Sequence, residues 1–189
     1  MMARLAICVI MASLCFTAAG CERSGAASEV KNDLEAIQTN SSAERQLGTL
    51  RSVVSKDTGK NIDKFIAKVH DFDYEIISEE ESDDKDGKTV IVTVRIKTYD
   101  FGSEYLAVMK EFAEVGNPEL GKDDDPAPFY DELFERFAKL DSKDYVKDVR
   151  IIAYSPNSSS EWVTNVKNNE ELQDALLGGM TAEMRELSK

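Results

Sequence analysis

Two stretches of the sequence alternate between apolar and polar residues, and they constrain the fold more than any other feature. The first reads DFDYEIISEEES and the second reads KTVIVTVRIKTYDF. Alternation of period two places one side of a strand in the core and the other side in water. Between the two stretches lies DDKDG, whose Asp86-Gly87 pair favours a tight hairpin turn. The sequence therefore predicts two antiparallel strands over 71–82 and 88–101, joined as a hairpin.

A second hairpin and several helices complete the predicted order. YVKDVRIIAYS and EWVTNVK read as strands around the turn PNSSS. Apolar residues at helical spacing predict helices near 30–37, from Ser41 to an end at Gly59, near 62–69, at 103–115, after Asp125 and near 169–177, with a charged tail beyond Gly178-Gly179. Both strand pairs are hairpins, which excludes a doubly wound parallel sheet. The expected class is α+β, with N-terminal helices packed on one face of a curved antiparallel sheet.

The first 20 residues have the pattern of a secretory leader. Arg4 precedes an apolar run that is too short to span a bilayer, which needs roughly 20 apolar residues. The run ends in Ala18-Ala19-Gly20-Cys21, which resembles a bacterial lipobox, where a lipid-modified cysteine becomes the mature N-terminus. We therefore expect a signal peptide at 1–20, lipidation of Cys21, a flexible tether at 21–28 and a single domain at 29–189. The location that follows is extracytoplasmic, on the cell membrane through this anchor.

Composition limits the chemistry of the mature chain. The full sequence has three cysteines: Cys8 and Cys15 lie in the predicted leader, and Cys21 is the predicted lipid site. The predicted domain therefore has no thiol for a disulfide or a cysteine-ligated metal. Removing the leader takes away Arg4 and no acid, so 23 basic and 36 acidic residues become 22 and 36, and the net charge goes from −13 to −14. This charge repels phosphate backbones, and no nucleic-acid partner is expected. Nothing in the sequence calls for a cofactor.

Three features together resemble small lipoproteins of Gram-positive anaerobes with a cystatin-like, nuclear transport factor 2-like fold. They are the lipobox followed by helices, the first hairpin running into a helix, and EWVTNVKNNEELQDALLGG closing the domain. The resemblance implies a cone formed by the curved sheet and its helices. It says almost nothing about activity, because this fold carries enzymes, binding proteins and scaffolds alike.

A ligand pocket inside the cone is one expectation of this fold. Its lining residues are expected to include Phe72, Tyr74, Val92, Val94 and Trp162. Tyrosine and tryptophan bring polar groups into an apolar space, as small-molecule sites often do. A core filled by these same side chains is the other reading of the pattern.

An enzyme and an assembly protein are the alternatives to a binding or interaction module. His70 is the only histidine, and with Asp71 or Asp73 it could transfer protons near neutral pH. A histidine at a helix C-terminus, interacting with the helix dipole, is the simpler interpretation. An assembly role would use the outward sheet face, expected to carry Thr93, Arg95, Lys97 and Tyr99.

No metal site is expected. SDDKDGKTVIVT resembles a calcium loop, but with its glycine at position six the first and twelfth positions are Ser82 and Thr93. Both key ligands are therefore missing. The sequence thus favours a membrane-anchored extracytoplasmic module that binds a ligand or a protein and has no catalytic role.

Overall fold

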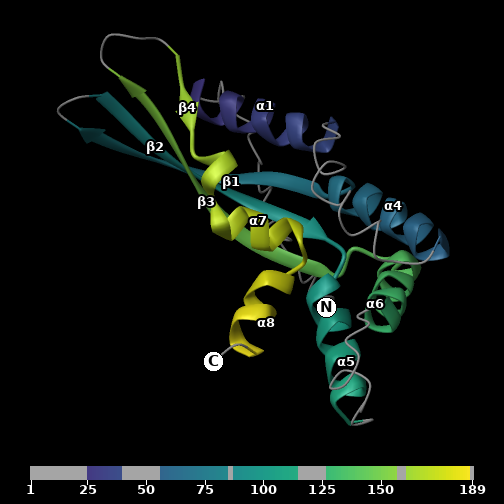
Figure 1. Cartoon of the computed structure of the whole chain (residues 1–189). Coiled ribbons are helices and arrows are strands. Elements are labelled where there is room, and N and C mark those ends of the chain that lie inside the picture. Colours follow the sequence, from purple (N-terminus) through teal and green to yellow (C-terminus); the bar gives the residue numbers. More distant parts are fainter. Residues whose placement is uncertain (1–24, 40–55, 85–86, 115–126, 157–160, 188–189) are drawn as a thin grey trace, which may run out of the picture.

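A four-stranded antiparallel sheet in the order β1-β2-β3-β4 forms the centre of the computed structural model (Figure 1). The structure describes residues 25–39, 56–84, 87–114, 127–156 and 161–187. In chain order its elements are α1 (Gly25–Thr39), α4 (Lys56–His70), β1 (Asp73–Asp84), β2 (Gly87–Thr98), α5 (Phe101–Glu114), α6 (Ala127–Lys139), β3 (Tyr145–Pro156), β4 (Val163–Thr164), the 3-10 helix η1 (Val166–Asn168), α7 (Glu170–Leu176) and α8 (Met180–Leu187). The predicted α+β class, with helices packed on an antiparallel sheet, is confirmed.

The predicted first hairpin is confirmed, and its pairing explains which side chains face the core. Ile76 pairs with Val94 and Tyr74 pairs with Ile96, so these four side chains share one face. The same face continues into β3, where Val149 lies opposite Val94. We call this the inner face. Its β2 positions from Val90 to Ile96 are 0–2% exposed, as the alternation predicts.

A β-bulge interrupts β1, and the sequence pattern gave no sign of it. The register shifts between Ile76 and Ser78, which leaves Ile77 as the extra residue. Beyond the bulge the faces exchange, so Glu79 lies opposite Val92 of the inner face, at the edge of the sheet. The apolar alternation of β1 therefore ends at Ile76.

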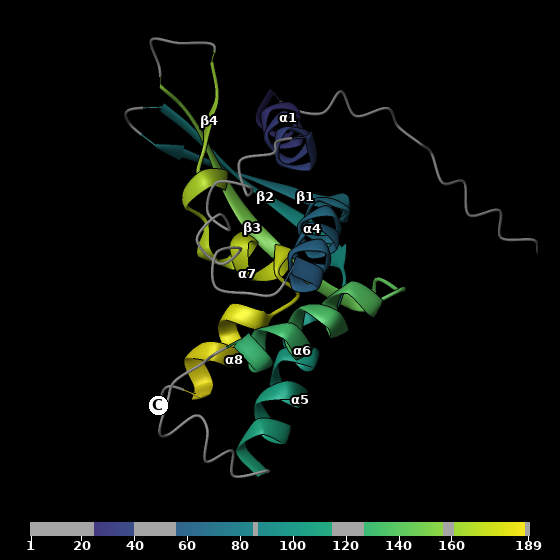
Figure 2. The same cartoon turned by 45° about the vertical axis from the view of Figure 1, so that its right-hand side comes forward.

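Two separate hydrophobic clusters hold the helices in place. The first lies between the inner face and the helices α1 and α7, and includes Val30, Leu34, Val92, Ile151 and Leu172. The second is mainly aromatic and lies among α4, α5 and α6. Figures 1 and 2 show α1 and α7 over the sheet, with α5, α6 and α8 gathered at one of its ends. The sheet therefore has helices on one face only among the described elements.

Two consecutive glycines join α7 to α8. Gly178 and Gly179 have φ values of 56° and 80°, which is the left-handed region that side chains disfavour. The Gly178 carbonyl accepts a hydrogen bond of 3.0 Å from the Gly102 N–H in α5. This turn thus fixes the position of α5 relative to the C-terminal helices.

Four differences from the prediction go beyond a shift of a few residues at the end of an element. Gly59, expected to end a helix, lies inside α4. The expected charged tail forms α8. The second hairpin forms, but β4 is only two residues long. The predicted helix from Ser41 falls mostly outside the described residues.

The fourth difference concerns the predicted tether at 21–28. Helix α1 begins at Gly25, and Ala26 and Ala27 are fully buried, so the packed domain starts within that range. The beginning of α1 lies close to Trp162, because a Cβ atom at Gly25 would come within 2.8 Å of the tryptophan Cδ1. The leader and Cys21 lie outside the described residues. Among the helices that the structure describes, none has the length and hydropathy needed to cross a membrane.

Candidate functional site

The outer face of the sheet is uncovered by any described helix. Its side chains alternate with those of the inner face and form rows across β1, β2, β3 and β4. Successive rows are Asp73–Lys97–Val146, Glu75–Arg95–Asp148, Ser78–Thr93–Arg150, Glu80–Ile91–Ile152 and Thr89–Tyr154–Val163. Alternating strands normally place polar side chains on such a wet face, so apolar residues there need an explanation.

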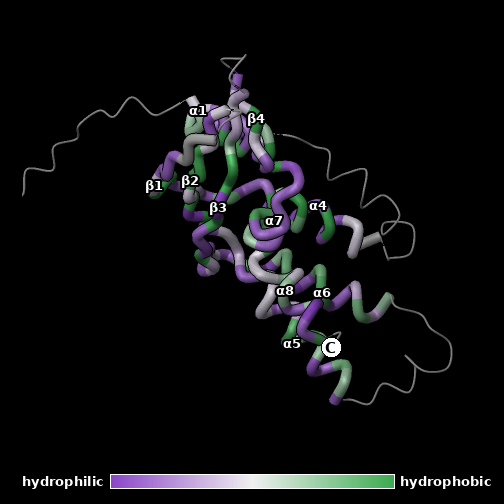
Figure 3. Tube along the Cα trace, turned by 90° about the vertical axis from the view of Figure 1, so that its left-hand side faces the viewer, coloured by the Kyte–Doolittle hydropathy of each residue, from purple (hydrophilic) through white to green (hydrophobic). Residues whose placement is uncertain are grey.

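One half of this face is apolar. Ile91, Ile152, Tyr154 and Val163 occupy two neighbouring rows, and we call them the outer apolar patch. Val163 is 64% exposed and Ile152 is 46% exposed. Along the backbone of β3, Figure 3 shows a first half that is mainly hydrophilic and a middle that is hydrophobic, where residues of both faces are apolar.

The other half of the outer face carries ion pairs. Arg95 binds Asp148 through two hydrogen bonds of 2.7 and 2.9 Å, and this contact raises the pKa of Arg95 and lowers the pKa of Asp148. Arg150 lies 3.9 Å from Glu80, next to the outer apolar patch. Because these pairs are exposed to solvent, they add little stability. The Glu80–Arg150 pair places charged groups next to the outer apolar patch.

Of the four residues predicted for this face, three lie on it. Thr93, Arg95 and Lys97 do so, whereas Tyr99 is buried. The strand ends at Thr98, so the alternation stops before Tyr99. The Tyr99 hydroxyl donates a hydrogen bond of 2.8 Å to Asp71, and this bond raises the pKa of Tyr99.

Lys143 holds both aspartates that follow His70. Its Nζ lies 2.8 Å from Asp71 and 3.0 Å from Asp73. The hydrogen bonds from Lys143 and then Tyr99 lower the pKa of Asp71. Burial acts against the charge of Lys143, but the two aspartates outweigh it and the pKa of Lys143 is raised.

His70 makes a different contact. Its Nδ1 lies 2.7 Å from the carbonyl oxygen of Ile37, and because that oxygen only accepts, Nδ1 donates. Its Nε2 is buried and has no hydrogen-bond partner among the described residues. The structure therefore does not bring His70 together with Asp71 or Asp73, which the acid–base hypothesis requires.

Replacing Lys143 by methionine is expected to make stability less sensitive to acid. Because the pKa of Asp71 is lower in the folded chain than its ordinary value of 3.8, the contacts of the ionised carboxylate stabilise the fold. This stabilisation is complete at pH values above 3.8, and it is lost as the pH falls from 3.8 through the lower pKa of the folded state. Lys143→Met removes the main cause. Its melting temperature should fall below that of the parent at about pH 7, and the difference should shrink at about pH 2. The exposed pair of Lys31 and Glu35 gives a control, since Lys31→Met should change little at either pH. A difference that stays constant with pH would contradict this role.

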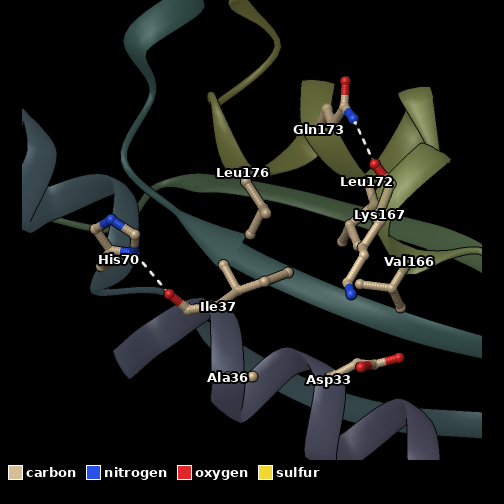
Figure 4. A pocket seen from close by; sticks show the side chains of 9 residues that line it. All are labelled: Asp33, Ala36, Ile37, His70, Val166, Lys167, Leu172, Gln173 and Leu176. Atoms are coloured by element: carbon tan, nitrogen blue, oxygen red, sulfur yellow. Dashed lines mark hydrogen bonds between the residues drawn. The ribbon is translucent and has the colours of Figure 1, made fainter. Parts of the chain in front are cut away.

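A pocket of about 370 Å³ lies between α1 and α7 (Figure 4). The described residues that line it are Asp33, Ala36, Ile37, His70, Val166, Lys167, Leu172, Gln173 and Leu176. Among them only His70 was considered as a site residue from the sequence. Five of the nine lie in the closing stretch EWVTNVKNNEELQDALLGG, and the other four come from α1 and the end of α4.

The five residues predicted to line a pocket lie together but do not line this one. Phe72, Val92 and Val94 are at most 1% exposed and belong to the first hydrophobic cluster, against which Tyr74 and Trp162 pack. Their side chains fill the space under α1. The pocket lies beside them, where Val166, Leu172 and Leu176 of the same cluster line it.

No group of three or more histidine, cysteine, aspartate or glutamate side chains within the described ranges has the geometry to hold a metal ion. No protein-family model, no curated protein and no solved structure matches the chain.

Proposed function

We propose that this chain is a lipid-anchored, extracytoplasmic interaction module that binds a protein partner through the outer apolar patch. The observation that carries the proposal is the patch itself: Ile91, Ile152, Tyr154 and Val163 lie side by side on a sheet face that no described helix covers. An exposed apolar patch with a polar rim is typical of a protein–protein interaction site.

The composition of the patch supports a protein as the partner. Its apolar centre contains a tyrosine, a residue enriched at interfaces because it combines a large apolar ring with a polar hydroxyl. The ion pair Glu80–Arg150 borders this centre, and the pair Arg95–Asp148 lies one row further along the strands. Such a rim adds charge complementarity, which selects among partners and raises the association rate.

The surroundings of His70 favour an interaction module over an enzyme. A proton-transfer pair needs a carboxylate within hydrogen-bond reach of the imidazole. Asp71 and Asp73 bind Lys143, and the imidazole binds a backbone carbonyl. The assembly role considered from the sequence would use the same outer face and is one form of this proposal.

The proposed location follows from the leader and from Cys21. Only residues 22–24 separate Cys21 from the beginning of α1. Four Cα-to-Cα steps reach at most about 14 Å, so an anchor at Cys21 would hold the β4 side of the sheet close to the membrane. A cystatin-like fold is part of the proposal, and the helix α1 lying across an antiparallel sheet supports it (Figure 2).

Site-specific photo-crosslinking in intact cells tests this function. A photo-reactive amino acid at position 152 or 163 is expected to capture the same partner from the membrane fraction. Position 146 is the matched control, because Val146 is exposed on the same face but lies in its charged half. Ile152→Asp should abolish capture from position 163. Equal capture from position 146, or none from either patch position, would rule out the patch as the interface.

The same experiment checks the anchor with one further variant. Cys21→Ser should leave the membrane fraction or remain unprocessed, since the thiol receives the lipid. If that variant is processed and still membrane-bound, the anchoring part of the proposal is wrong and the patch result stands on its own.

A further inference from the structure

The pocket between α1 and α7 has two opposite walls. Helix α1 forms one wall, η1 and α7 form the other, and His70 at the end of α4 lies at one end (Figure 4). Its volume of about 370 Å³ lies in the range of small-molecule sites, roughly 300–1,000 Å³. This site is distinct from the outer apolar patch, since the sheet separates them.

The middle of the pocket is apolar. Ala36 and Ile37 of α1 face Leu172 and Leu176 of α7, and Val166 lies beside them. These side chains offer no hydrogen bond to a ligand. The body of a molecule bound here must therefore be apolar as well.

Two opposite charges lie at the other end, away from His70. Lys167 extends from η1 toward α1, and Asp33 lies on α1 at that same end (Figure 4). The Thr164 hydroxyl donates a hydrogen bond to the Asp33 carboxylate and so fixes its orientation. No ion pair joins Lys167 to Asp33 in the part of the chain that the structure describes, so each charge can bind a ligand group.

We propose that this pocket binds a free α-amino acid with an aromatic or long aliphatic side chain. Its ammonium group would bind Asp33 and its carboxylate would bind Lys167. Its side chain would lie between Ile37 and Leu176. Lys167 is exposed and Asp33 is half-buried, so both charges are hydrated when the pocket is empty. A ligand with only one charge would gain one charge-assisted contact instead of two, and its charge would lie near the like charge of the other side chain.

Calorimetric titration of the full chain with four compounds tests the ligand class. L-Phenylalanine carries both charges and an aromatic body. 3-Phenylpropionate lacks the ammonium group, 2-phenylethylamine lacks the carboxylate, and L-serine lacks the apolar body. Phenylalanine is expected to bind about tenfold or more tightly than each of the other three. Equal affinity for phenylalanine and the two single-charge compounds, or no binding of phenylalanine at millimolar concentration, would overturn the proposal.

Two variants assign each charge to its group. Asp33→Asn keeps an acceptor for Thr164, and it should weaken phenylalanine about tenfold while leaving 3-phenylpropionate unchanged. Lys167→Gln should weaken phenylalanine similarly and leave 2-phenylethylamine unchanged. Lys31→Gln, which changes a charge on the exposed side of α1, is the control and should bind all compounds like the parent. Because each variant is judged by a ratio between two ligands, a general loss of folding cannot imitate the expected result. If Asp33→Asn weakens the binding of phenylalanine and of 3-phenylpropionate equally, the proposed binding mode is wrong.

Discussion

Replacing Gly178 by alanine is expected to lower the melting temperature by more than about 5 °C. The residue has a φ of 56°, and holding a side chain in that region costs about 1–3 kcal/mol. A Cβ atom there would also overlap the carbonyl oxygen of Tyr99 and lie 2.7 Å from the Phe101 nitrogen. Both are backbone atoms, so they cannot move aside as a flexible side chain can. For a chain of this size each kcal/mol corresponds to about 2–4 °C, and the strain and the overlap add.

Gly59 provides the matched control. It lies inside α4, and a Cβ atom there would meet nothing within 4 Å. Gly59→Ala should therefore leave the melting temperature unchanged or raise it, because alanine is favoured over glycine in a helix by up to about 1 kcal/mol. Thermal unfolding followed by circular dichroism measures both variants. Equal melting temperatures for the two would mean that the turn after α7 does not need its left-handed conformation.

Truncating Phe101 to alanine is expected to remove about 3–5 kcal/mol of unfolding free energy. The ring is fully buried, and its centroid lies 4.9 Å from that of Phe65 and 5.2 Å from that of Phe137. It therefore joins α5 to α4 and α6. The loss combines the transfer of the ring to water with a cavity that its rigid neighbours cannot close.

Phe112 on the same helix is the control for this cavity. It is only partly buried and contacts Phe129 at the margin of the aromatic cluster, with ring centroids 5.5 Å apart. Phe112→Ala should cost much less. Urea unfolding measures both, and the midpoint should shift with an unchanged slope if the variants remain two-state. A similar loss for both variants would show that Phe101 is not central to the cluster.

The sheet was predictable because its signal is local. Each of β2 and β3 alternates over most of its length, so the inner residues, such as Val92 and Ile151, follow from the period alone. The hairpin turn is marked by Asp86-Gly87. The bulge at Ile77 was not predictable, because the apolar pair Ile76-Ile77 is compatible with either residue facing inward.

The helix boundaries were harder to predict, because a glycine does not end a helix by itself. Gly59 is open to solvent within α4, whereas Gly178 ends α7 through its positive φ. The sequence contains no signal that separates these two cases. The residues of α8 were likewise interpreted as a charged tail after Gly178-Gly179. In the structure this helix has no buried residue, and its apolar Met184 and Leu187 are exposed, so burial of an apolar face does not mark it.

The outer apolar patch and the pocket differ in how much of each could be predicted from the sequence. The outward-facing positions of β2 were correctly assigned, but the outer apolar patch depends on which residues of β3 and β4 lie beside Ile91. That information is the strand register, which the sequence pattern did not provide. The pocket depends on the packing of α1 against η1 and α7, and Asp33 and Lys167 are separated by more than 130 residues in the chain.

The acidic sequence of β1 affects whether two copies of the chain can associate through the edge of the sheet. β1 forms an edge of the sheet, and among the described strands it pairs only with β2. An edge strand can recruit a strand from a neighbouring molecule and begin aggregation. Here Glu75, Glu79, Glu80 and Glu81 lie along that edge, and the bulge at Ile77 breaks its regular hydrogen-bonding pattern. Two such edges would repel each other, and the bulge would disturb their pairing, so the acidic residues and the bulge protect this edge from polymerisation when chains are crowded.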